Sequence, residues 1–120
     1  MSDSKDNFLT RSPDFRAVLK YRTAKEGGRK TPAYSGYRPH VKFSGKSELT
    51  SGQQKFINRD KINPWETVEA EITLLWTGPF KSYLHESLEF GFYEGSVLIG
   101  TKIILQVLDK SLEKKFNSKL

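Results

Sequence analysis

The fold class is decided by residues 66–76, whose sequence is ETVEAEITLLW. Polar residues, among them Glu69 and Glu71, occupy every second position from 67 to 73. The positions between and after them are apolar and hold Val68, Ala70, Ile72, Leu74 and Trp76. A period of two is typical of a β-strand that has one face in the core and the other in water. We therefore expect these five apolar side chains to point into a core.

Five further segments carry strand signals. They cover residues 15–22, 37–43, 53–57, 88–92 and 97–108. Turns that contain glycine or proline separate most of them, as in antiparallel all-β domains. The last segment can also be read as a buried helix, but its β-branched residues and Gly100 favour a strand. Six strands with no convincing helix before residue 108 predict an all-β fold, namely a six-stranded antiparallel closed β-barrel.

Length and composition predict one domain with short extensions, because 120 residues suffice for a single core. We expect a flexible N-terminal arm over residues 1–13, the barrel over 14–108, and a flexible or short helical tail over 109–120. The polar opening predicts no secretory signal. The apolar runs are far shorter than the roughly 20 residues of a membrane helix, so we expect no membrane partner. The absence of cysteine excludes disulfides and thiolate metal sites and favours a cytoplasmic location.

Basic residues are concentrated in one region of a chain whose net charge is +6. A basic balance favours nucleic acid as a partner, although a merely soluble surface can carry the same charge. A glycine-containing loop and the polar face of the strand that follows it form a basic stripe, which consists of Lys25, Arg29, Lys30, Arg38, His40 and Lys42. We expect this stripe to contact the phosphates and 2′-hydroxyls of tRNA or another structured RNA.

Two neighbouring motifs carry a resemblance to a known family. They are KEGGRKTP at residues 25–32 and SGYRP at residues 35–39. They resemble the Glu-Gly-Gly-Arg-His-Thr-Pro and Gly-Tyr-Arg-Pro-Gln signature of the third, C-terminal domain of bacterial elongation factor Tu. The likeness extends over residues 15–108 and includes VEAEI at 68–72 and the paired strands at 90–100. The chain thus resembles that domain standing alone.

The resemblance implies a six-stranded barrel that packs against a GTPase domain and contacts the T-stem backbone of aminoacyl-tRNA. By position, the family's tRNA-contacting residues correspond to Arg29, Lys30, His40, Glu94 and Gly95. The sequence departs from the family where lysine replaces histidine at position 30 and histidine replaces glutamine at position 40. It has no GxxxxGK[S/T] phosphate loop, so we expect no nucleotide to be bound by this chain in that way.

Arg29 and Arg38 admit two interpretations, because arginines beside glycine often brace a loop by donating to carbonyl groups. We expect a contact role for Arg29 and a structural role for Arg38, which an aromatic residue and a proline flank. His40 and His85 are the only histidines, and neither has partners at the spacing of a catalytic triad or a metal site. We therefore expect no cofactor and no enzymatic activity.

Trp65 and Phe80 each follow a proline in a predicted turn, where a large apolar residue is unexpected. They either plug the two ends of the barrel or form a protein-docking patch. The second interpretation favours an alternative function. In that alternative, this chain is a protein-interaction domain of decoy or immunity type. It imitates the elongation-factor domain and binds a translation-related or factor-binding protein. Self-association of a diverged domain is a third possibility.

Overall fold

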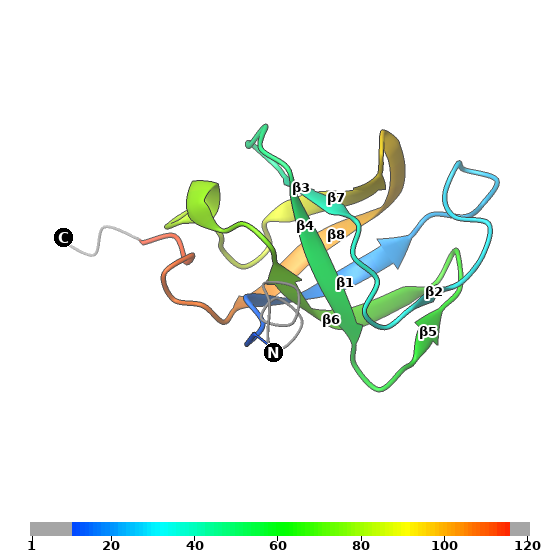
Figure 1. Cartoon of the computed structure of the whole chain (residues 1–120), viewed down its shortest axis with the longest axis horizontal. Helices are drawn as coiled ribbons and strands as arrows, with labels where there is room; N and C mark the ends of the chain where they lie inside the picture. Colours follow the sequence, from blue (N-terminus) through cyan, green and yellow to red (C-terminus); the bar gives the residue numbers. More distant parts are fainter. Residues whose placement is uncertain (1–10, 116–120) are drawn as a thin grey trace, which may run out of the picture.

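Six antiparallel strands close into a barrel in the computed structural model, which describes residues 11–115. Around the barrel the strands follow the order β1-β6-β4-β3-β7-β8, and each neighbouring pair is antiparallel. Their bounds are β1 Phe15–Tyr21, β3 His40–Phe43, β4 Thr50–Phe56, β6 Thr67–Leu74, β7 Glu89–Glu94 and β8 Val97–Val107. The predicted fold class, an all-β six-stranded antiparallel closed barrel, is confirmed (Figure 1).

Three short elements lie outside the barrel sheet. β2 (Ala33–Tyr34) and β5 (Lys61–Ile62) pair with each other as a separate two-stranded sheet, and η1 (Gly78–Phe80) is one turn of 3₁₀ helix. The sequence does not predict β2 or β5, because two residues are too few to show a periodicity. In the described part of the chain, no helix has the length and apolar character that crossing a membrane requires.

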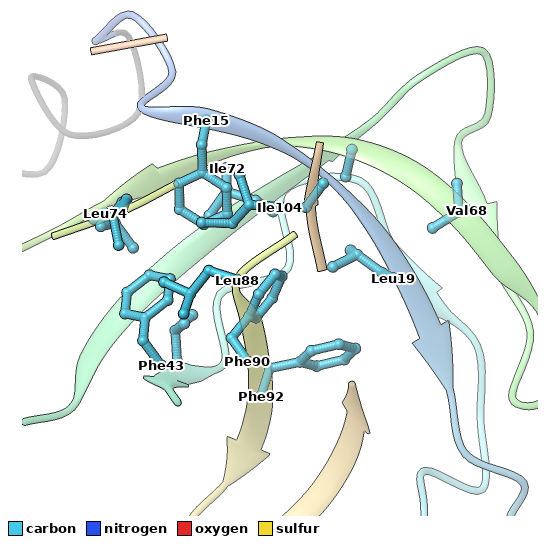
Figure 2. Packing of buried hydrophobic residues seen from close by; sticks show 14 of the residues in the cluster. Phe15, Leu19, Phe43, Val68, Ile72, Leu74, Leu88, Phe90, Phe92 and Ile104 are labelled. Atoms are coloured by element: carbon cyan, nitrogen blue, oxygen red, sulfur yellow. The ribbon is translucent and has the colours of Figure 1, made fainter. Parts of the chain in front are cut away.

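Aromatic rings fill much of the barrel interior. Phe15, Phe43 and Phe90 meet in edge-on or tilted contacts, with ring centroids 5.7 to 5.8 Å apart. Tyr21 and Phe92 form a second contact, with centroids 5.0 Å apart. Figure 2 shows the labelled phenylalanines pointing into the space between the strands. Rings at such distances attract each other beyond the effect of burying their area.

β4 is longer than the sequence predicts. A strand is expected over residues 53–57 after a loop, whereas the strand runs from Thr50 to Phe56. Gly52 has the appearance of a loop residue, yet it lies inside the strand and is buried. A methyl group on it would lie 2.7 Å from Val41 Cγ2, so the glycine makes room for a core side chain of the neighbouring strand.

Trp76 lies outside the core, contrary to the prediction. β6 ends at Leu74, and the two residues that follow, Leu75 and Trp76, are 60% and 53% exposed. The alternation stops earlier than the sequence pattern indicates because the chain leaves the barrel wall there. Phe80, by contrast, is fully buried, and its ring centroid lies 5.1 Å from that of Phe43. Phe80 therefore plugs the interior and is not available as a docking residue.

The segment after β8 packs against the barrel. Leu112 is fully buried, and its carbonyl accepts hydrogen bonds from the backbone N–H groups of Tyr83 (3.0 Å) and Leu84 (2.8 Å). The N–H of Lys114 donates to the Leu84 carbonyl at 2.7 Å. One buried leucine and these backbone bonds hold residues 109–114 in place, in the segment for which the sequence predicts a flexible or short helical tail.

The described part of the predicted N-terminal arm is also bonded to the barrel. The guanidinium of Arg11 donates to the Leu74 carbonyl at 2.6 Å and pairs with Asp14 at 2.9 Å. The rest of the predicted arm, residues 1–10, and the end of the predicted tail, residues 116–120, lie outside the described residues.

The connecting segments collect at two opposite ends of the barrel (Figure 1). β1 finishes where β6 and β8 begin, since Lys20 pairs with Thr67 and Tyr21 pairs with Gly100. This end carries the segment 22–32, the β2–β5 sheet and the β7–β8 turn, and we call it the β2–β5 end. The opposite end carries both ends of the described chain and the segment that follows β6.

Candidate nucleic-acid interface

The loop over residues 22–32 is built around its two glycines. Gly27 has a φ of +106°, a left-handed conformation that glycine adopts without strain. A methyl group on Gly28 would lie 2.7 Å from the backbone oxygen of Arg22, which is far inside normal contact distance. Glycine is therefore needed at position 27 for its backbone conformation and at position 28 for its lack of a side chain.

Hydrogen bonds tie this loop to itself and to β8. The backbone N–H of Thr23 donates to the Glu26 carboxylate, and the N–H of Glu26 donates to the Thr23 hydroxyl, both at 2.9 Å. The Arg22 guanidinium donates to the carbonyl of Leu98 at 2.9 Å and to the carbonyl of Glu26. These bonds fix the loop and leave Lys25 exposed on it.

Arg29 braces the loop from within. Its guanidinium donates to the backbone oxygens of Thr31 at 3.2 Å and Pro32 at 3.0 Å. It also forms an ion pair with Glu94 and lies 4.9 Å from the centroid of the Tyr37 ring. The Tyr37 hydroxyl donates to the same Glu94 carboxylate. The guanidinium of Arg29, which the sequence leads us to expect in contact with RNA, is thus bonded within the protein. Arg29 has the bracing role that we expected for Arg38.

The contacts around Glu94 keep its carboxylate ionised. Partial burial acts to raise its pKa, but hydrogen bonds from Tyr37 and Arg29 outweigh this and hold the pKa below its usual value. Burial and the neighbouring Glu94 carboxylate raise the pKa of Tyr37 above that of an ordinary phenol. At neutral pH the cluster therefore contains one anion, one cation and a neutral phenol, and its net charge is zero.

The other residues of the basic stripe are exposed. They are Lys25, Lys30, Arg38, His40 and Lys42. On β3, His40 and Lys42 face outward because the intervening Val41 and the final Phe43 are buried. This strand confirms the predicted alternation, with a polar outer face and an apolar inner face.

The contact between Arg29 and Tyr37 brings together the two segments that carry Lys30 and Arg38. Lys30 follows Arg29 in the loop, and Arg38 follows Tyr37 on the approach to β3. Because the Arg29 guanidinium lies over the Tyr37 ring, the segment that carries Lys30 lies next to the segment that carries Arg38. Gly95 has a φ of +60° in the β7–β8 turn, and no atom lies within 4 Å of the place its side chain would occupy.

A groove of about 490 Å³ continues the basic stripe across β3, β7 and β8. Lys42 from β3 and Lys102 from β8 contribute cations to its lining, and Tyr93 and Leu98 contribute apolar surface. Gly91 lies between them, and a methyl group there would lie 3.1 Å from Leu98 Cδ1. The sequence does not predict that Lys102 lies near Lys42. The two residues lie near each other because the barrel places β7 between β3 and β8.

An apolar patch lies at the opposite end of the barrel. It consists of Leu49, Leu75 and Trp76, which are 47%, 60% and 53% exposed. The backbone N–H of Leu75 donates to the Ser51 carbonyl, and that of Trp76 donates to the Thr50 hydroxyl, both at 2.9 Å. These bonds join the start of β4 to the end of β6, so the backbone segments that carry the three residues lie side by side.

The two predicted docking residues do not lie together. Trp65 is 60% exposed in the turn between β5 and β6, at the β2–β5 end, whereas Phe80 is buried in the core. Within residues 11–115, no group of three or more histidine, aspartate or glutamate side chains is gathered closely enough to hold a metal ion.

A scan of the chain against protein-family models finds no match. The resemblance to the elongation-factor domain therefore rests on the motifs at residues 25–32 and 35–39 and the strand segments that accompany them. The barrel agrees with that resemblance but does not identify the family, since one fold serves many families.

Proposed function

We propose that this chain is a non-catalytic binding module of translation-factor type that contacts the backbone of structured RNA such as tRNA. Its contact surface is the exposed part of the basic stripe, which consists of Lys25, Lys30, Arg38, His40 and Lys42. The proposal depends on one observation: the contact between Arg29 and Tyr37 holds the loop against the approach to β3, and the contact-surface residues of both segments are exposed. The resemblance to the third domain of elongation factor Tu supports the same class of partner.

Recognition of an RNA backbone suits this surface. A-form RNA is bound mainly through phosphates and 2′-hydroxyls, because its deep major groove hides the base edges. Cations on a braced loop and a rigid strand lose less conformational freedom on binding than cations on a mobile segment. Glu94 does not oppose the phosphates, since Arg29 neutralises it. Arg29 and Glu94 are therefore positioning residues in this proposal.

The test is the binding of labelled tRNA or an RNA hairpin as a function of salt concentration. Each phosphate contact contributes about 0.7 to 0.9 to the slope of log affinity against log salt. The double variant Lys30→Ala/Lys42→Ala should lower the slope by about 1.4 to 1.8 if both lysines contact phosphates. The matched control is Lys81→Ala/Lys110→Ala, which removes two exposed lysines at the opposite end of the barrel. If the wild type shows no saturable binding at low salt, the proposal fails.

Protein binding is a second candidate function, and the exposed apolar patch of Leu49, Leu75 and Trp76 favours it. In this alternative the chain imitates the elongation-factor domain as a decoy or immunity-type partner of a factor-binding protein. Capture of a partner protein from cytosol would then be unaffected by nuclease treatment. It would be lost with Trp76→Ser and kept with Lys30→Ala/Lys42→Ala, whereas the opposite pattern favours RNA.

A further inference from the structure

The turn between β5 and β6 holds a tryptophan in an unfavourable backbone conformation. The N–H of Glu66 donates to the carbonyl of Asn63 at 3.1 Å, which closes a four-residue turn with Pro64 and Trp65 at its centre. Trp65 has a φ of +80°. Proline followed by a residue with positive φ is the arrangement of a type II turn, whose third position favours glycine or asparagine. A bulky aromatic residue in that position is strained.

Core packing does not explain why this position holds tryptophan. The side chain is 60% exposed, so most of its surface remains in water. A glycine would adopt the same turn without strain, and the backbone N–H of residue 65, which donates to the Arg22 carbonyl at 3.3 Å, would be kept. Strain that the fold does not need points to a function for the side chain.

Cations lie on the two segments next to this tryptophan, which are the loop over residues 22–32 and β5. The bond from Trp65 to Arg22 joins the turn to the first residue of the loop that carries Lys25 and Lys30. Lys61 is exposed on β5, four residues before Trp65 in the sequence. An exposed aromatic ring among lysines is the combination that binds unpaired nucleotides, because the ring stacks on a base while the cations contact the phosphates.

We propose that Trp65 is a stacking platform for an unpaired base at the end of a bound RNA duplex. Lys25, Lys30 and Lys61 contact the phosphates on either side of that base. This inference deepens the proposed function and depends on it. It adds that the preferred RNA carries a single-stranded extension, whereas the basic stripe alone requires only a duplex backbone. An acidic protein partner at the same tryptophan is the competing explanation, and the experiment below separates the two.

The experiment compares a blunt-ended RNA hairpin with the same hairpin carrying a short single-stranded 3′ extension. The wild type should bind the extended hairpin more tightly by roughly 5- to 150-fold, which corresponds to stacking one base on an aromatic side chain. Trp65→Gly should bind both hairpins equally and should match the wild type on the blunt one. Trp76→Leu, which changes the other exposed tryptophan at the opposite end of the barrel, should keep the preference.

Two further readouts separate function from structure. The chain has two tryptophans, so Trp76→Phe leaves Trp65 as its only one, and the extended hairpin should quench its fluorescence. Trp65→Gly should melt at a temperature no lower than the wild type, because it relieves the strained turn. A clearly lower melting temperature would show that the tryptophan serves stability and would overturn the inference.

The outcomes distinguish this inference from the proposed function. Binding of both hairpins with no preference in the wild type overturns the stacking site and leaves the backbone contact standing. A preference that survives Trp65→Gly also overturns it. Failure to bind either hairpin overturns both proposals, and a partner protein whose capture requires Trp65 then supports the competing explanation.

Discussion

The guanidinium carbon of Arg29 lies 4.9 Å from the centroid of the Tyr37 ring, and both side chains bond the carboxylate of Glu94. Arg29 belongs to the glycine-containing loop, Tyr37 to the approach to β3, and Glu94 to the end of β7. The cluster joins β7 to two segments that lie 65 and 57 positions away in the sequence. It therefore fixes the loop that carries Lys25 and Lys30.

Replacing Arg29 by lysine should destabilise the fold by about 1 to 2 kcal/mol, because lysine keeps the charge but loses the rigid fork of donors. One ammonium group cannot reach Thr31, Pro32 and Glu94 at once. Urea denaturation measures the loss. Arg59→Lys is the matched control, since Arg59 pairs with Glu66 at 2.9 Å, and it should cost less than about 0.5 kcal/mol. Equal losses in the two variants would contradict the bracing role.

The stability that Glu94 contributes should disappear in acid. Its pKa in the folded chain lies below the usual glutamate value of about 4.3, so its contribution is complete above that value. The contribution is lost as the pH falls through the lower, folded value. The side chain is 42% exposed, so we expect at most about 1 kcal/mol. Denaturation of the wild type and Glu94→Gln should show a difference that shrinks on acidification. A difference that stays constant with pH would contradict the linkage.

Gly28→Ala should be clearly destabilising. The added methyl group would lie 2.7 Å from the Arg22 carbonyl oxygen, and a backbone atom cannot move aside cheaply, so we expect about 1 to 3 kcal/mol. Gly78→Ala is the control, because its methyl group would meet only the indole nitrogen of Trp76 at 3.4 Å. Thermal melting of both variants tests this. A Gly28→Ala protein as stable as Gly78→Ala would show that the close approach is not required.

Phe80→Ala should cost about 3 to 5 kcal/mol of unfolding free energy, because it removes a fully buried ring that packs on Phe43. Trp76→Ala should cost less than about 1 kcal/mol, because its side chain is more than half exposed. Chemical denaturation of the two variants compares two large aromatic residues only four positions apart. The reverse order of stability would contradict the assignment of core and surface in this segment.

Local periodicity was sufficient to predict the barrel wall. The predicted inward residues of β6 are buried from Val68 to Leu74, and the predicted strand β1 is likewise buried at every second position from Phe15 to Tyr21. The alternation of side chains is a property of consecutive residues in any strand and does not depend on the identity of the partner strand. The outward positions of His40 and Lys42 were predictable for the same reason.

Periodicity failed to predict where strands begin and end. Trp76 continues the pattern of β6 but follows the end of the strand, so it is exposed. Gly52 looks like a loop residue but lies inside β4, because Val41 of the neighbouring strand needs the space. No pattern within either segment reports the end of a strand or the size of a side chain across from it.

The sequence by itself determined the fold class, the inward residues of the main strands and the basic chemistry of one surface. Only the tertiary structure decided which cations that surface presents. Arg29 is engaged by Glu94, which lies 65 positions away in the chain, while Lys25 and Lys30 stay exposed in the same loop. The physical reason is that pairing between distant side chains depends on the register of the closed barrel, which neighbouring residues in the chain do not encode.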